Sequence, residues 1–151
     1  MLREAITERM KTALRAKDTR TLSTVRLIMA ALKDRDIAAR SDGARPEIPE
    51  TEIMRMLQGM VKQRRESIEL YQKGNRPELA RQEGEEIAVI ESFLPQQMDD
   101  AAIEAAANAA ITESGAAGIK DMGKVMAALR ERHAGVIDLA RAGAIVKRLL
   151  G

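Results

Sequence analysis

Residues 50–73 read ETEIMRMLQGMVKQRRESIELYQK, and this stretch decides the fold class. Its apolar side chains recur at every third or fourth position, as at Ile53, Leu57 and Val61, which is the period of one face of an α-helix. Strong helix formers occupy most of the intervening positions. Gly74 follows and suits the end of a helix, where a left-handed residue is favoured. The stretch therefore predicts a long amphipathic helix.

The same helical pattern extends over the rest of the 151 residues. Ala, Leu, Met, Glu, Arg and Lys dominate the composition, whereas the aromatic residues that favour sheets make up 1% of it. We therefore predict an all-α protein. The expected helices of the first part run from about Leu2 to Ala16, from after Lys17–Thr19 to about Arg40, from about Glu50 to Lys73, and from Asn75 to Pro95. Three further helices are expected to start at Asp99 or Asp100, at Asp121 and at Asp138.

Local signals place the ends of these helices. Asp18, Asp99 or Asp100, and Asp138 are N-cap candidates for the helices that follow them. Asn75 suits an N-cap, with Glu78 three residues later as its reciprocal partner. Pro95 is expected to end the fourth helix, because the residue before a proline avoids helical geometry. The polar stretch 41–49 contains one glycine and two prolines and is predicted to be a loop.

The composition changes after Pro95, where the chain becomes rich in alanine and has no aromatic residue. We predict an N-terminal domain of about four helices over residues 1–94 and a small three-helix tail domain over residues 95–151. A domain of this second size has a small core and is expected to be only marginally stable alone. The excess of positive charge lies in residues 1–94, which hold 18 basic and 16 acidic residues.

Composition also excludes several classes of protein. The chain has no cysteine, which rules out disulfides, thiol nucleophiles and thiolate metal sites. Charges recur from Arg3 through Lys17, so the start holds no apolar export signal, and we expect a cytoplasmic protein without a membrane partner. A net charge of +2 does not by itself indicate a polyanion partner, and no DNA partner, metal or cofactor is predicted.

Three features that resemble catalytic motifs have simpler interpretations. Residues 118–124 match the start of a phosphate-binding loop, but Val125 replaces the hydroxyl residue that holds magnesium. The simpler interpretation is that Asp121 caps the following helix. The lone His133 lies near a predicted helix end, where an imidazole commonly meets free carbonyls. Glu83 and Glu86 share a helix face and are expected to pair with the basic third helix. No catalytic residue is predicted.

The densest positive run is Lys62-Gln63-Arg64-Arg65. Arginine suits a bidentate grip on phosphate, so Lys62, Arg64 and Arg65 are candidates for RNA binding. The alternative is a solvated helix face whose charges are paired with the neighbouring acidic helix.

The chain resembles the YqeY-like family, in which the tail domain is shared with the B subunit of the tRNA-dependent amidotransferase. The resemblance covers nearly the whole chain and rests on several spaced segments. These are Lys62–Ile68, Tyr71, Gly74, Arg76, Leu79-Ala80, Glu83, Glu86-Ile87 and Phe93–Pro95, and then Met122–Met126, Gly135, Asp138 and Val146-Lys147.

This resemblance implies a tail that helps to hold tRNA, and it adds Lys120, Lys124, Lys147 and Arg148 to the candidate RNA-binding residues. It also brings the family's link to carbon–nitrogen ligase activity with glutamine as amido-N-donor, which we attribute to the larger enzyme. The expected function is therefore a non-catalytic tRNA-associated binding module. The alternative is a protein–protein adaptor for an amidotransferase or a glutaminyl-tRNA synthetase.

Overall fold

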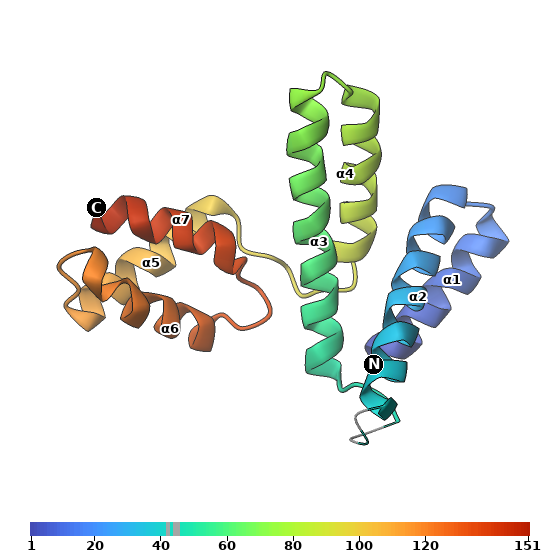
Figure 1. Cartoon of the computed structure of the whole chain (residues 1–151), viewed down its shortest axis with the longest axis horizontal. Coiled ribbons are helices and arrows are strands. Elements are labelled where there is room, and N and C mark those ends of the chain that lie inside the picture. The colour runs from blue at the N-terminus through green and yellow to red at the C-terminus, as the bar shows by residue number, and fades with distance from the viewer. Residues whose placement is uncertain (42, 44–45) are drawn as a thin grey trace. The chain divides into compact units, whose positions relative to one another are not determined.

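The computed structural model describes residues 1–41, 43 and 46–151, and every regular element within them is a helix (Figure 1). The all-α prediction is confirmed. In the predicted loop 41–49, Asp42, Ala44 and Arg45 lie outside the described residues. The helices are α1 (Leu2–Ala16), α2 (Thr19–Ser41), α3 (Glu50–Lys73), α4 (Pro77–Glu91), α5 (Asp100–Ser114), the 3-10 turn η1 (Ile119–Asp121), α6 (Met122–Arg132) and α7 (Leu139–Leu150).

The chain divides into two compact units, Met1–Leu94 and Pro95–Gly151. In the first, α1 packs on α2, α3 packs on α4, and α2 joins the two pairs through its contacts with α3 and α4. Ile28, Leu57 and Ile90, from α2, α3 and α4, are fully buried at its centre. These three side chains come from helices far apart in the sequence, so burial of their apolar surface holds the unit together.

The second unit is formed by α5, α6 and α7, each of which contacts the other two. Its core contains large side chains such as Ile103, Leu129 and Val146 alongside the fully buried alanines Ala107 and Ala142. Small residues at these positions let the helix backbones approach closely. The three helices thus bury a continuous core without any aromatic side chain.

Aspartate side chains begin three of the helices, as their positions predict. Asp18 Oδ1 accepts a hydrogen bond from the Thr21 amide at 3.2 Å, before α2. Asp99 accepts one from the Ala102 amide at 2.8 Å, before α5. Asp138 accepts from the amides of Ala140 and Arg141 at the start of α7. Each carboxylate satisfies backbone donors that have no partner inside the helix.

The turn between α3 and α4 differs from the prediction. Asn75, and not Gly74, has the left-handed conformation, with φ +56°. The Asn75 amide donates to Gln72 O at 3.2 Å and the Arg76 amide to Tyr71 O at 2.8 Å, the hydrogen-bond pattern of a Schellman motif. Asparagine tolerates this backbone geometry better than most residues, so it ends α3 instead of capping α4.

The end of α4 also differs. The helix stops at Glu91, before the expected end at Pro95, and is followed by turns at Ser92, Phe93 and Leu94. The Leu94 side chain is buried there nonetheless. Leu94 therefore contributes to the core although it lies after the end of α4.

None of the helices in the described residues is long and apolar enough to cross a membrane.

Candidate functional site

The hairpin formed by α6 and α7 places several predicted RNA-binding residues at one end. Only residues 133–138 join the two helices, so they run antiparallel, and the start of α6 lies beside the end of α7 (Figure 1). A Cβ atom added at Gly151 would lie 3.2 Å from Cδ1 of Ile119, so the turn before α6 lies close to the end of α7. Lys124, in the first turn of α6, and Lys147, in the last turn of α7, therefore belong to the same end of the hairpin.

Lys120, Lys124 and Lys147 form what we call the tail lysine cluster. All three side chains are exposed, and none forms a hydrogen bond or an ion pair with another described residue. Because their ammonium groups are not neutralised by the protein, they remain available to an anion from solution. Lysine presents a compact charge with three donors, which suits phosphate oxygens in many orientations.

The N-terminus of α6 adds to the positive potential of this cluster. No side chain caps it, because the Asp121 carboxylate accepts a hydrogen bond from the Ala117 amide at 3.0 Å instead. The prediction that Asp121 caps this helix is therefore wrong. The Met122 amide donates to Ile119 O in the preceding turn η1, and the N-terminal end of the α6 dipole carries partial positive charge. The negative charge of Asp121 offsets part of the field from the three lysines.

Arg148 differs from the tail lysine cluster because it has a partner. Its Nη2 lies 3.0 Å from Oε2 of Glu104 on α5, in a pair whose side chains stay 62% and 43% exposed. An ion pair this accessible contributes little to stability and can exchange for another anion at small cost. Arg148 thus extends the cluster only if its contact with Glu104 is given up.

The three candidates on α3 likewise divide into side chains with an ion-pair partner and one without. Arg64 Nε lies 2.8 Å from Oε2 of Glu86, with both side chains about nine-tenths buried at 12% and 13% exposure. Arg65 Nη2 lies 2.9 Å from Oε1 of Glu91. Lys62 is exposed and has no partner among the described residues. The alternative interpretation, that α4 pairs the arginine charges of this run, holds for Arg64 and Arg65.

The carboxyl group of Glu83, near the Arg64–Glu86 ion pair, has a shifted pKa. Burial, together with the charge of Glu86, raises the pKa of Glu83 above its usual value. Arg64 lies near enough to lower it in part. Glu86 already forms an ion pair with Arg64, so Glu83 and Glu86 are not a pair of free carboxylates.

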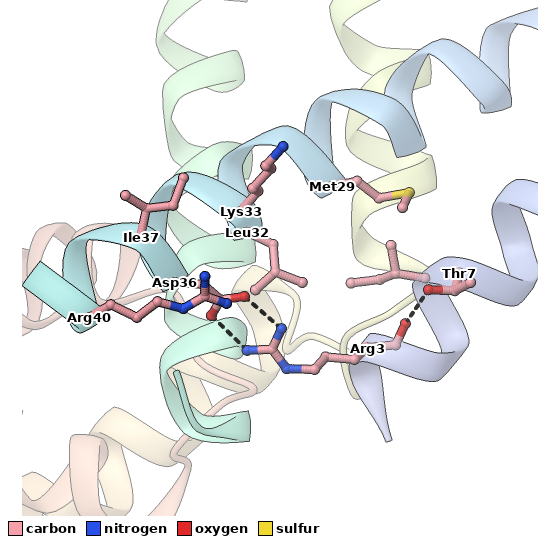
Figure 2. Close-up of a pocket in the computed structure, with 9 residues that line it drawn as sticks. Arg3, Thr7, Met29, Leu32, Lys33, Asp36, Ile37 and Arg40 are labelled. Atoms are coloured by element: carbon pink, nitrogen blue, oxygen red, sulfur yellow. Dashed lines mark hydrogen bonds and ion pairs between the residues drawn. The ribbon is translucent and has the colours of Figure 1, made fainter. Parts of the chain in front are cut away.

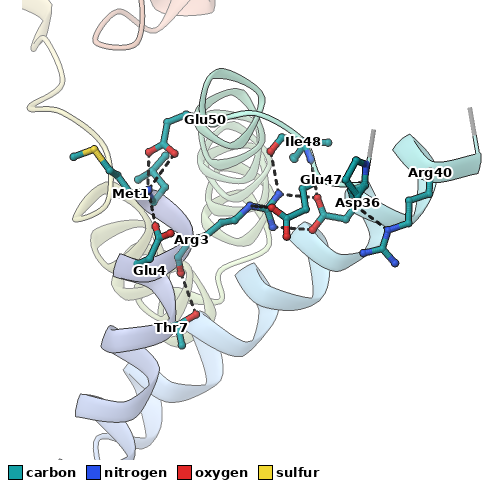
Figure 3. Close-up of polar contacts among 11 residues, drawn as sticks. Met1, Arg3, Glu4, Thr7, Asp36, Arg40, Glu47, Ile48 and Glu50 are labelled. Carbon is teal, nitrogen blue, oxygen red and sulfur yellow. Dashed lines mark hydrogen bonds and ion pairs between the residues drawn. The ribbon is translucent and has the colours of Figure 1, made fainter. Parts of the chain in front are cut away.

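Sequence analysis missed a polar cluster around Arg3, shown in Figure 3. Two guanidinium nitrogens of Arg3 donate to the two carboxylate oxygens of Asp36 at 2.8 Å each. Arg3 also donates to Ile48 O at 3.0 Å, and the Ile48 amide donates to Asp36 at 2.9 Å. The hydrogen bonds from Arg3 hold the pKa of Asp36 below its usual value. The cluster ties α1, α2 and the segment before α3 together.

This cluster closes one wall of a pocket of about 400 Å³ between α1 and α2 (Figure 2). Ile6, Met29 and Leu32 supply its apolar surface, and Arg3 and Asp36 its buried charge. Because those two charges neutralise each other, the pocket lacks a free buried group with which to bind or activate a ligand. We regard it as part of the packing of α1 on α2.

Two further features of the part of the chain that is described are its possible metal-ligating side chains and its histidine. Within it, no group of three or more His, Cys, Asp or Glu side chains gathers at metal-binding distances. His133 occupies the position after the last residue of α6, and its backbone amide donates to Leu129 O at 3.0 Å. The expected capping by its imidazole is absent, since that ring forms no hydrogen bond with the described residues.

Comparison with known proteins gives a family match along nearly the whole chain. Residues 3–150 match the family model described as Yqey-like protein. Over 106 residues the chain is 29% identical to "Altered inheritance of mitochondria protein 41, mitochondrial" of Lachancea thermotolerans, covering 69% of this chain and 54% of that protein. The protein of the same name from Vanderwaltozyma polyspora is 29% identical over 97 residues, covering 60% and 50%. The chain thus spans about half the length of the curated relatives it matches.

Proposed function

The chain belongs to the Yqey-like protein family, and from this premise we propose that it is an RNA-binding protein that holds tRNA through its phosphates. The observation that carries the proposal is the tail lysine cluster. Three exposed lysines without protein partners lie around one end of the α6–α7 hairpin, beside the uncapped N-terminus of α6. We also propose that residues 95–151 correspond to the tail domain of the amidotransferase B subunit that they resemble.

The chemistry of the cluster favours recognition of shape over recognition of sequence. Phosphate contacts position a protein on a nucleic acid, whereas base contacts read its sequence. Residues 95–151 contain no Phe, Tyr or Trp side chain on which a base could stack. A folded RNA presents closely spaced phosphates and 2′-hydroxyls to such a surface. The protein is therefore expected to prefer structured tRNA without strong dependence on its sequence.

The test is equilibrium binding of tRNA to the full chain over a series of salt concentrations. Each phosphate contact made by a cation contributes about 0.7 to 0.9 to the salt slope of the affinity. Substituting Lys120, Lys124 and Lys147 by Gln should therefore flatten the slope by about 2 to 3 and weaken binding at least about tenfold at low salt.

A matched control removes the same amount of charge elsewhere. Lys11, Lys33 and Lys73 are exposed lysines in the first unit, so their triple change to Gln leaves the same net charge as the change in the tail lysine cluster. The control should retain the salt slope of the unmodified protein. Absence of tRNA binding at low salt, or equal losses in the two triple variants, would refute the proposed function.

A further inference from the structure

A second open site lies between α2 and α3. It is a groove of about 500 Å³, formed by one turn of α2 and three turns of α3. Arg35 stands on the α2 side, and Lys62, Gln63 and Glu66 stand on the α3 side. The groove belongs wholly to residues 1–94, so it is separate from the tail lysine cluster.

Both cations of this groove are without protein partners. Arg35 and Lys62 are exposed, and neither forms a hydrogen bond or an ion pair with another described residue. This contrasts with Arg64 and Arg65 on the same helix, whose charges are paired with glutamates of α4. Two unpaired cations, one on each helix, can bind one anionic group between them. Arg35 can do so through two parallel hydrogen bonds, a geometry that phosphate matches.

The floor of the groove is apolar. Met56 is 2% exposed, so the apolar surface that faces the groove comes from Met60, which is partly buried against the same core. Between them Gly59 leaves space, because a Cβ atom at that position would meet no heavy atom within 4 Å. Methionine is flexible and polarisable, and it adapts to the flat faces of ligands. The groove therefore offers an apolar surface next to two positive charges.

Glu66 and Gln63 complete the lining with hydrogen-bonding groups. The Glu66 carboxylate accepts hydrogen bonds, and the Gln63 amide both donates and accepts them. A ligand that matches the two cations, the apolar floor and these hydrogen-bonding groups carries an anion, a flat apolar body, and hydroxyl or amino donors. Inorganic phosphate lacks the flat apolar body.

The dimensions of the groove favour a compact ligand. The α2 wall consists of Ala31 and Arg35, which are four residues apart and span about 6 Å at the helical rise of 1.5 Å per residue. A helical peptide uses anchors over two turns and needs a longer wall. The volume of about 500 Å³ lies within the range of small-molecule sites.

From this combination we propose that the α2–α3 groove binds a nucleotide, with its phosphate between Arg35 and Lys62 and its base on Met60 beside Gly59. The ligand is either a free mononucleotide or a single unpaired nucleotide of an RNA. This site does not depend on the tail lysine cluster.

The experiment titrates the full chain with 5′-AMP, adenosine, inorganic phosphate and a short single-stranded oligoribonucleotide, followed by NMR. We expect saturable binding of AMP or of the oligoribonucleotide below about 1 mM, and weaker binding of adenosine and of phosphate. Arg35→Gln and Lys62→Gln should each weaken that binding about tenfold, the usual effect of losing a charge-assisted hydrogen bond.

Gly59→Leu tests the groove without changing charge. The added side chain enters open space and replaces a poor helix former, so the variant should fold and block the ligand. Gly84→Leu on α4 is the matched control, because a Cβ atom there also meets nothing within 4 Å and Gly84 does not line the groove. Binding should fall at least about tenfold in the first variant and stay unchanged in the second.

The outcomes separate the sources of the ligand and the two proposals. Binding of AMP identifies a free nucleotide, and binding of the oligoribonucleotide alone identifies an RNA. The triple variant of the tail lysine cluster should retain either one, even if tRNA binding is lost. Absence of saturable binding of both AMP and the oligoribonucleotide, phosphate binding as tightly as AMP, or unchanged binding in Gly59→Leu would each overturn the proposal.

Discussion

At the scale of single residues, the contact between Arg3 and Asp36 joins α1 to α2 in the first unit. The two side chains are 25% and 11% exposed, so their charges are shielded from water and depend on each other. Asp36→Asn keeps the shape of the side chain but leaves the Arg3 guanidinium without its counter-ion. We expect this change to lower the free energy of unfolding by about 2 kcal/mol, measured by urea denaturation followed by circular dichroism.

The dependence of this loss on pH provides a second readout. Because Arg3 lowers the pKa of Asp36 in the folded state, the stabilisation is fully present above the unfolded pKa. It is lost as the pH falls through the folded pKa. The difference between Asp36→Asn and the unmodified protein should therefore stay constant from about pH 5 to 8 and shrink below about pH 4.

The exposed pair of Arg76 and Glu78 supplies the control for both measurements. Its side chains are 60% and 59% exposed, although their hydrogen bond is also 2.8 Å long. Glu78→Gln should cost much less than Asp36→Asn, because surface ion pairs contribute little to stability. Equal losses in Glu78→Gln and Asp36→Asn would show that the cluster around Arg3 has no special role.

Sequence patterns predict contacts between residues close in the chain better than contacts between distant ones. Asp18, Asp99 and Asp138 were recognisable as caps because each acts on amides two or three residues ahead. Arg3 and Asp36 are 33 residues apart, and neither occupies a distinctive local pattern. Their pairing depends on how α1 packs on α2, which no local signal specifies.

At the scale of helices, we expect capping by Asp99 to contribute measurably to the stability of the second unit. Its carboxylate accepts from the Ala102 amide at 2.8 Å, and the small core of this unit leaves little stability in reserve. Asp99→Ala should lower the unfolding free energy by about 1 kcal/mol, or the melting temperature by roughly 4–8 °C for a domain near this size. Thermal unfolding followed by circular dichroism measures the shift.

Glu131→Ala is the control for the loss of a negative charge. Glu131 is exposed on α6 and forms no hydrogen bond or ion pair with the described residues, so its removal should change the unfolding free energy by less than about 0.5 kcal/mol. If Asp99→Ala has no larger effect than Glu131→Ala, the cap does not limit the stability of α5.

The helices themselves follow from the apolar period, whereas their ends depend on competition between neighbouring residues. Gly74 and Asn75 both accept the left-handed geometry, and the sequence alone favours glycine. The hydrogen bonds of the Asn75 and Arg76 amides to the last turn of α3 decide for Asn75. The same limit applies to the candidate sites: the spacing of Lys62, Arg64 and Arg65 revealed a positive run, but only the packing of α4 shows which charges are paired.

At the scale of the whole molecule, the buried residues form two separate clusters. One is drawn from Ile6 to Leu94, and the other from Ile103 to Val146. Each cluster thus closes within its own stretch of chain. This arrangement raises the question of whether the second unit carries enough apolar burial to fold without the first.

We predict that residues 95–151, expressed alone, form a folded three-helix domain of low stability. All three helices contact one another, and the large core side chains Ile103, Leu129 and Val146 are at most 1% exposed, so the unit buries its apolar faces internally. Circular dichroism should show helix that melts cooperatively, and Leu129→Ala should abolish the folded state, since loss of a buried leucine costs about 2–5 kcal/mol. A non-cooperative melt of the fragment would show instead that the two units depend on each other for folding.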